Sequence, residues 1–167
     1  MNEKEKTVLL SVPNISGNEL KYVKECLETG WISSAGSYVD KFEKMVADYA
    51  GAKYGIATMN GTAALHIALL LAGVKPKDYV IVSNMTFVAS ANSIKYTGAD
   101  PILIDADPKT WQMDLDLLDE FLDYKTSVNS EGERILISDG RCVKTIMPVH
   151  IQGNIFDVDR FLVICEK

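Results

Sequence analysis

Short apolar segments alternate with amphipathic segments from about residue 50 onward. The apolar segments are typical of buried strands, since they are continuous and are bounded by Gly, Pro or polar residues. The predicted strands are residues 54–58, 79–83, 101–105 and 144–149. The predicted helices are residues 62–72, 86–97 and 157–167, with another that opens at Asp114 or Asp116 and runs to Tyr124. This order indicates an α/β fold with a mostly parallel sheet flanked by helices.

The first 50 residues differ, because they predict helices and no strand. Ser16 and Glu19 have capping-box spacing, which predicts a helix ending at Gly30. After a loop at residues 31–36, Ser37 is placed to cap a second helix with one apolar face. We therefore expect residues 1–50 to form an N-terminal helical segment with a dimer-type loop, and residues 51–167 to form an incomplete α/β domain.

Residues 125–143 interrupt the alternation of strands and helices. Turn-forming residues at 129–132 and 138–140 flank a short apolar run at 134–137. Such a pattern predicts a β-hairpin inserted into the α/β domain.

A glycine turn precedes the helix predicted at residues 62–72. The backbone N–H groups of Gly61, Thr62 and Ala63 are expected to be unpaired at the start of this helix, where the helix dipole is positive. This arrangement favours binding of a phosphate group. The alternative is that Thr62 is merely a helix cap.

Other candidate residues follow the carboxyl ends of two further strands, where ligands bind in open α/β sheets. Phe87 follows residues 79–83, and His150 and Gln152 follow residues 144–149. A phosphate seat beside an aromatic ring suits a phosphorylated aromatic cofactor. Each residue also has a structural interpretation: Phe87 as a core aromatic, His150 as a structural histidine, and Trp31 as a cover for the core edge.

Composition narrows the possible partners of the chain. The net charge is −6, and Lys and Arg form no stripe, so we expect no nucleic-acid partner. Apolar runs are too short to span a bilayer, and the charged N-terminus does not resemble a secretory signal, so we expect a cytoplasmic protein without a membrane partner. The 3 cysteines are dispersed, and 2 histidines are too few for an evident metal site.

Several short motifs occur together in a characteristic order. They are residues 12–17, 30–36, 42–43, 60–66, 86–87, 91–92, 96–101 and 148–153. In this order the sequence resembles the N-terminal part of DegT/StrS-type sugar aminotransferases, which use pyridoxal 5'-phosphate (PLP) and have the fold type I large domain. The resemblance is greatest to the LegC-like branch, which aminates 4-keto nucleotide sugars on the way to bacillosamine- and legionaminic-acid-type sugars. The insertion at 125–143 fits that branch.

The resemblance implies a role for each candidate residue. It implies that Gly61, Thr62 and Ala63 bind the PLP phosphate, that Phe87 stacks on its ring and that Asn92 lies near the site. It also places Trp31, Ser33, His150 and Gln152 on the substrate side, with the loop of Trp31 and Ser33 meeting substrate across a dimer interface. Glutamate is the expected amino donor of the intact enzyme, which is expected to be a homodimer.

The sequence also departs from the family pattern. The family's Asp against the pyridine nitrogen and its Schiff-base Lys have no counterparts up to Lys167. We therefore expect an N-terminal fragment, from a truncated or frameshifted gene or an incomplete gene model, that is inactive alone. The alternative is a non-catalytic fragment or split subunit that pairs with a full-length or C-terminal partner. A dinucleotide-binding oxidoreductase is disfavoured, because residues 60–64 do not form a GxGxxG motif.

Overall fold

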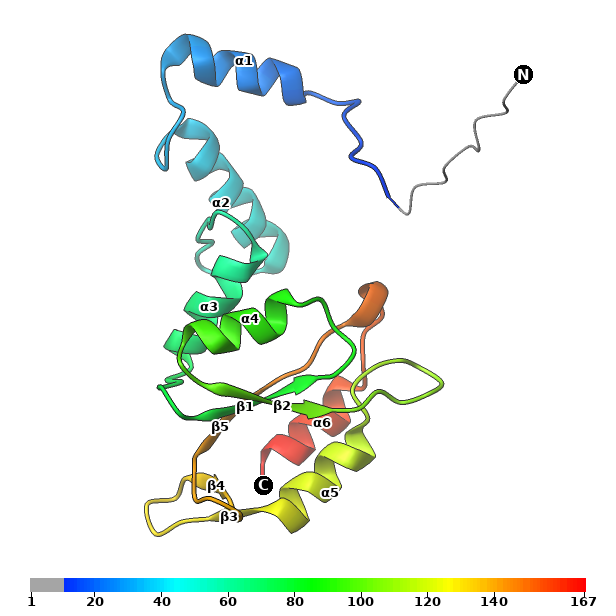
Figure 1. The fold of residues 1–167 in the computed structure, drawn as a ribbon. Coiled ribbons are helices and arrows are strands. Elements are labelled where there is room, and N and C mark those ends of the chain that lie inside the picture. Colours follow the sequence, from blue (N-terminus) through cyan, green and yellow to red (C-terminus); the bar gives the residue numbers. More distant parts are fainter. Residues whose placement is uncertain (1–10) are drawn as a thin grey trace, which may run out of the picture. The chain divides into compact units, whose positions relative to one another are not determined.

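The computed structural model describes residues 11–167 and divides into two compact units, residues 1–57 and 58–167 (Figure 1). The first unit contains helices α1 (Glu19–Thr29) and α2 (Ser37–Ala50). The predicted caps of both helices are wrong. Asn18 precedes α1 and Gly36 precedes α2, and neither makes a side-chain cap.

The correction has a physical reason at each helix. The hydroxyl of Ser16 donates to Asn14 Oδ1 at 2.7 Å and is therefore turned away from α1. Ser37 is already the first helical residue of α2, so it lies one position too late to cap it. The predicted end of α1 at Gly30 is confirmed, since Gly30 adopts the left-handed conformation with φ 75°.

The strand predicted at residues 54–58 is also wrong, because this segment has no strand conformation in the structure. The segment instead packs on α2. The Ala57 N–H donates to Glu43 Oε1 at 2.8 Å, and a Cβ added at Gly55 would lie 2.4 Å from the Glu43 carbonyl oxygen. Gly55 therefore permits a close approach to the helix that any other residue would prevent.

The second unit is built on a three-stranded parallel sheet with the order β2-β1-β5. Its strands are β1 (Tyr79–Ser83), β2 (Asp100–Ile104) and β5 (Val143–Met147). Three of the predicted strands are thus confirmed within one or two residues. Because the strands are parallel, the loops that follow them meet at the same edge of the sheet.

Helices cover both faces of this sheet (Figure 1). The helices are α3 (Gly61–Leu71) and α4 (Ala89–Tyr96) on one face, and α5 (Leu115–Lys125) and α6 (Val158–Cys165) on the other. Alternate residues of β1 serve the two cores: Val80 and Val82 pack with α3 and α4, whereas Ile81 packs with α5 and α6. The central strand is therefore buried on both faces, and the predicted α/β fold is confirmed.

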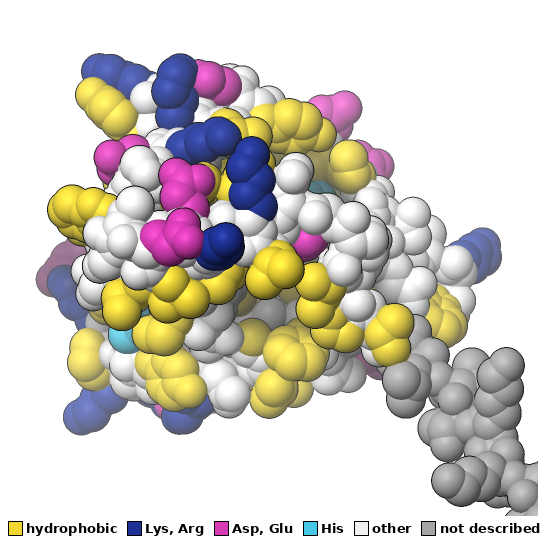
Figure 2. All heavy atoms as spheres, turned by 90° about the horizontal axis from the view of Figure 1, so that it is seen from above, with side chains coloured by type: hydrophobic (Ala, Val, Ile, Leu, Met, Phe, Trp, Pro, Cys, Tyr) yellow, Lys and Arg dark blue, Asp and Glu magenta, His cyan; other side chains and the backbone are white. Residues whose placement is uncertain are grey.

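Large apolar side chains are also exposed on the surface, where Figure 2 shows them beside charged groups. Examples from the second unit are Met59, Leu71 and Phe87, which are 91%, 84% and 79% exposed. Among residues 11–167, no helix combines the length and hydrophobicity that a membrane span requires.

A short antiparallel pair lies in the segment where a hairpin insertion was predicted. It consists of β3 (Thr126–Val128) and β4 (Arg134–Leu136), and Thr126 pairs with Leu136. The chain then enters β5 from its amino end, so the hairpin lies at the sheet edge opposite to the loops that follow the strands.

A polar cluster at this edge joins the hairpin to the sheet. Asp100 accepts from Lys95 Nζ and Arg141 Nη2, each at 2.5 Å. Arg141 also donates to the Tyr79 hydroxyl at 2.9 Å, and that hydroxyl donates to Asp139 Oδ2 at 2.9 Å. The hydrogen bonds from Lys95 and then Arg141 hold the pKa of the Asp100 carboxyl below its ordinary value.

This cluster predicts that the protein loses stability as the pH falls. In the variant Asp100→Asn, which has no carboxyl group at this position, stability should depend less on pH. The pKa of Asp100 is lower in the folded state, so the unfolded state takes up its proton first as the pH falls. The stability from this group is present above the unfolded pKa of about 4 and is lost as the pH falls through the folded value. Urea unfolding midpoints of both proteins across this range provide the measurement, and equal slopes against pH would contradict the prediction.

Candidate functional site

The predicted phosphate seat is the N-terminus of α3, and Asn60 organises it. Asn60 has extended backbone geometry, and its Oδ1 accepts from the Ala63 N–H at 2.9 Å. The prediction that Ala63 has an unpaired N–H group is therefore wrong, because the Asn60 side chain caps it. Within residues 11–167, the N–H groups of Gly61 and Thr62 have no acceptor. The helix start thus offers these two donors together with the positive end of its dipole.

The same geometry excludes one of the two interpretations of Thr62, that of a helix cap. Asn60 occupies the N-cap position, whereas Thr62 is the second residue of α3 and its side chain is half-buried. Thr62 is therefore not the cap of this helix. Sequence reasoning missed Asn60, although Asn followed by a helix start is a recognised capping signal.

Replacing Asn60 with Ala is expected to lower the free energy of unfolding by about 1 kcal/mol, since the Ala63 N–H would lose its acceptor. The variant Asn60→Ser provides the matched control, because a serine hydroxyl can make the same cap. Urea unfolding followed by circular dichroism measures both variants. A loss that is equal in the two would contradict the capping role.

The predicted aromatic residue, Phe87, lies in the loop between β1 and α4 and is 79% exposed. Its interpretation as a core aromatic is therefore excluded. A hydrogen bond of 2.8 Å between the Thr86 and Ser90 hydroxyls joins this loop to α4, where Ser90 is buried. The loop therefore holds Phe87 at the surface beside the start of α4.

Helices α3 and α4 lie side by side on one face of the sheet (Figure 1). Each runs antiparallel to β1, so the two helices are parallel and both begin at the edge where the strands end. His66 contacts Tyr96 edge to face, with ring centroids 5.9 Å apart. Thr62 and Asn92 each lie about one helical turn before these two residues, and the side chain of Asn92 is exposed.

His150 and Gln152 lie after β5, in and beside the short 3-10 helix η1 (Ile151–Gly153). Both side chains are exposed. The imidazole of His150 stacks on Phe156 with centroids 4.9 Å apart, so His150 has a structural contact as well as an exposed position. The turn follows a strand parallel to β1, which places it at the same sheet edge as the loop of Phe87.

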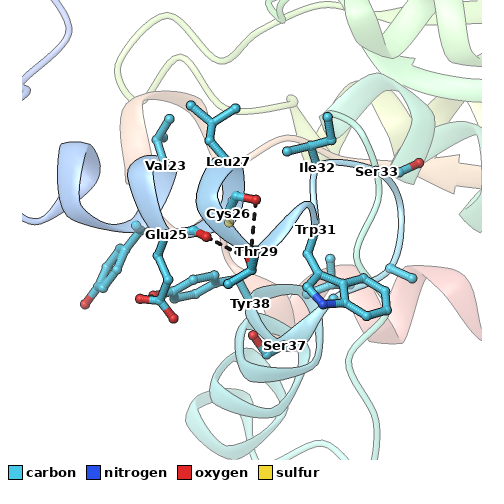
Figure 3. A pocket seen from close by; sticks show the side chains of 14 residues that line it. Val23, Glu25, Cys26, Leu27, Thr29, Trp31, Ile32, Ser33, Ser37 and Tyr38 are labelled. Atoms are coloured by element: carbon cyan, nitrogen blue, oxygen red, sulfur yellow. Dashed lines mark hydrogen bonds between the residues drawn. The ribbon is translucent and has the colours of Figure 1, made fainter.

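Trp31 and Ser33 line a cavity of about 680 Å³ between α1, the following loop and the start of α2. Figure 3 shows their side chains pointing in different directions from this loop. Trp31 is 61% exposed, so it contributes little to a core. Both residues belong to the first unit, and the structure places them only within that unit.

Lys167 is excluded as a candidate nucleophile by its surroundings. Its ammonium group forms ion pairs with Asp119 at 2.5 Å and Asp123 at 2.8 Å, on the face of α5 and α6. The hydrogen bonds with Asp119 and then Asp123 raise the pKa of Lys167, which favours the protonated, non-nucleophilic form.

Comparison with known protein families identifies the family of this chain. The model of the DegT/DnrJ/EryC1/StrS aminotransferase family matches residues 13–167. The chain belongs to this family. The family predicted from the sequence motifs is therefore confirmed, whereas the LegC-like branch stays a prediction.

Curated relatives of this DegT/DnrJ/EryC1/StrS chain include sugar-modifying enzymes. GDP-perosamine synthase of Caulobacter vibrioides is 42% identical over 160 residues, which are 96% of this chain and 38% of the relative. The Bacillus subtilis protein EpsN, named a putative PLP-dependent aminotransferase, is 35% identical and is matched over 96% of this chain and 39% of its own length. The chain thus spans about two fifths of the length of these relatives.

Two solved structures share the fold of this chain. The putative sugar aminotransferase Spr1654 from Streptococcus pneumoniae, in its pyridoxamine phosphate (PMP) form, has a TM-score of 0.75 at 30% identity. The match covers 95% of this chain and 36% of Spr1654. A 3-amino-5-hydroxybenzoic acid synthase gives a TM-score of 0.73 at 28% identity, over 93% of this chain and 36% of the synthase.

Proposed function

We propose that α3 supplies the phosphate seat of a PLP-dependent aminotransferase that aminates a keto sugar carried on a nucleotide. The observation that carries this proposal is the pair of unpaired N–H groups of Gly61 and Thr62 at the start of α3. They lie at the sheet edge where α4 also begins and where Phe87 is exposed. The start of α3 can thus bind a phosphate, and Phe87, just before α4, can stack on a planar ring.

The residues present fit the charge of the PLP phosphate and the apolar face of its ring. The two N–H groups and the α3 dipole stabilise a phosphate dianion, while the Asn60 side chain occupies the Ala63 N–H and fixes the first helical turn. Phe87 offers an exposed apolar face against which a pyridine ring can stack. Asn92, one turn into α4, offers an amide for a polar group beside that ring.

PLP, when bound, acts as an electron sink through which an amino group passes from an amino acid to a keto sugar. This chain's own residues bind and orient the reactants. Gly61 and Thr62 would fix the phosphate end, and Phe87 would set the plane of the ring. His150 and Gln152, exposed at the same sheet edge, would face the sugar nucleotide. Trp31 and Ser33 are proposed to contact substrate from the first unit.

The proposed substrate is a 4-keto nucleotide sugar of the bacillosamine or legionaminic-acid type, with glutamate as the amino donor. The hairpin of β3 and β4 supports this branch. A GDP-linked keto sugar is the second candidate, because the relatives at 42% and 39% identity are named GDP-perosamine synthases. We further propose that the complete enzyme is a cytoplasmic homodimer.

A non-catalytic role is the alternative, in which this chain pairs with a full-length or separately encoded partner. The exposed apolar side chains of the first unit support it, including Leu20, Leu27, Phe42 and Tyr49, which are each more than half exposed. These side chains lie on α1 and α2, which we propose as the pairing surface.

Co-expression tests both proposals. The chain is produced alone and together with the part of the Caulobacter relative that it does not match, and each sample is supplied with PLP, glutamate and UDP- or GDP-linked 4-keto sugars. We expect an amino sugar nucleotide and 2-oxoglutarate only from the paired sample. A stable pair that binds no PLP and forms no product would refute catalysis and support the structural role.

A further inference from the structure

Gln112 is a buried polar side chain that the predicted site does not include. It lies in the loop between β2 and α5 and is 5% exposed. Its Nε2 donates to the Asn154 carbonyl at 3.1 Å, and its Oε1 accepts at 3.4 Å from the Ile151 N–H, which also donates to the Val149 carbonyl at 3.0 Å. The partners lie 42 and 39 residues further along the chain. Both ends of one carboxamide therefore bind the backbone of the turn after β5.

The backbone of Gln112 is itself held in place. The Asp107 N–H donates to the Gln112 carbonyl at 2.9 Å, and the Gln112 N–H donates to Thr110 Oγ1 at 3.3 Å. The Asp107 carboxylate accepts from the N–H groups of Lys109 and Thr110 at 2.9 and 2.7 Å. Gln112 thus projects from a loop with many internal hydrogen bonds, which is a suitable support for a distant segment.

The turn that Gln112 binds contains an unfavourable backbone conformation. Gln152 has φ 52° and ψ 26°, in the left-handed region that residues other than glycine rarely adopt. Within the turn, the Gly153 N–H donates to the His150 carbonyl at 3.1 Å and the Asn154 N–H donates to the Ile151 carbonyl at 3.0 Å. These bonds join residues only three apart in the sequence. The hydrogen bonds from Gln112, on another loop, add a long-range constraint that holds the turn in one conformation.

We propose that Gln112 is a positioning residue that fixes the turn at residues 150–154 and, through it, the directions of His150 and Gln152. The fixed turn would present an imidazole and a carboxamide to the polar sugar portion of the substrate. The substrate contact rests on the proposed function, whereas the fixing of the turn does not. The loop after β2 therefore contributes to the site without touching the ligand.

Two variants of Gln112 distinguish the contribution of the hydrogen bond that its Nε2 donates from that of the bond that its Oε1 accepts. Gln112→Met has a similar volume and removes both hydrogen bonds. Gln112→Glu keeps an acceptor for the Ile151 N–H at every pH, but it can donate to the Asn154 carbonyl only when it is protonated. Burial raises the pKa of the introduced carboxyl. Charged groups that line the same cavity as Gln112 also influence it: Asp107, Lys109, Asp114, Asp116, Asp157 and Arg160.

The measurements are amide hydrogen-exchange protection at Ile151 and Gly153, and the NMR shifts of the His150 ring protons, which report on stacking against Phe156. We expect Gln112→Met to lower the turn protection about tenfold at every pH. In Gln112→Glu, protection should fall at about pH 8 and return at about pH 5. The His150 shifts, compared with those of the wild type at the same pH, should differ at about pH 8 and agree at about pH 5. Protonation should restore the protection only if the hydrogen bond donated to the Asn154 carbonyl orients the turn.

Thr126→Val provides the control, because Thr126 is also buried and donates to the Leu122 carbonyl at 2.5 Å, at the other end of α5. This variant should leave the His150 shifts unchanged. The proposal is overturned if Gln112→Met leaves turn protection and the His150 shifts unchanged, or if it lowers protection equally throughout the second unit. The absence of pH-dependent recovery in Gln112→Glu would also overturn it. A failed amination assay with these turn results intact would refute the proposed function alone.

Discussion

Replacing Thr62 with Glu is expected to weaken PMP binding on the order of 100- to 1000-fold. A carboxylate at the second residue of α3 would lie beside the N–H groups that are proposed to bind the phosphate. Two like charges about 4 Å apart repel by about 4 kcal/mol at an effective dielectric constant of 20, and the phosphate carries more than one charge. PMP is the appropriate probe because it lacks the aldehyde with which PLP labels surface lysines. Titration followed by ligand fluorescence gives the Kd.

Three comparisons make this result specific to the phosphate seat. Thr62→Ser keeps the hydroxyl and should bind PMP like the wild type. Ser130→Glu adds the same charge in the exposed turn between β3 and β4, and it should also bind normally. Pyridoxamine without its phosphate should bind weakly to all of these proteins. Equal PMP affinity for Thr62→Glu and the wild type would refute the assignment of the seat to α3.

Replacing Leu118 with Ala is expected to lower the free energy of unfolding of the second unit by about 2–5 kcal/mol. Leu118 is 0% exposed and packs in the core that α5 and α6 form with the sheet, among Ile81 and Ile104. Its truncation leaves a cavity that a close-packed core cannot readily fill. Since a domain is stabilised by only about 5–15 kcal/mol, a large part of its stability would be lost.

Leu71→Ala is the matched control for this effect. It removes the same atoms from a side chain that is 84% exposed, so its effect should be within about 0.5 kcal/mol. Urea unfolding midpoints of the two variants provide the comparison. If Leu118→Ala lowered the free energy of unfolding as little as Leu71→Ala does, the core on the α5 face would contribute little to stability.

The sequence predicted the second unit well because its signals are local and repeated. Continuous apolar runs located β1, β2 and β5. The helix predicted to open at Asp114 or Asp116 is α5, which Asp114 caps, since its Oδ1 accepts from the Asp116 and Leu117 N–H groups. The same apolar signal predicted a strand at residues 54–58, where the structure has none. Apolar composition cannot report whether a neighbouring strand is available for pairing, and Gly55 instead allows this segment to pack on α2.

The candidate site was predicted less completely than the fold. The start of α3 was predicted within one residue, whereas its role as a phosphate seat stays a prediction. The distribution of its N–H donors depended on the Asn60 side chain, which takes up the Ala63 N–H. Gln112 was missed because its partners are about 40 residues away and a single glutamine in a loop carries no periodic signal. The dense turn signals from Asp107 to Thr110 could have indicated that this loop is ordered.

The position of the hairpin has a practical consequence for protein engineering. It joins the sheet at the amino ends of the strands, where Arg141 and Asp100 attach it, whereas the proposed ligand contacts gather at the opposite edge. Its exposed tip around Gly132 is therefore a suitable place for an epitope tag or a fluorescent label. A reporter there would follow assembly of the protein while leaving the edge with the proposed ligand contacts free.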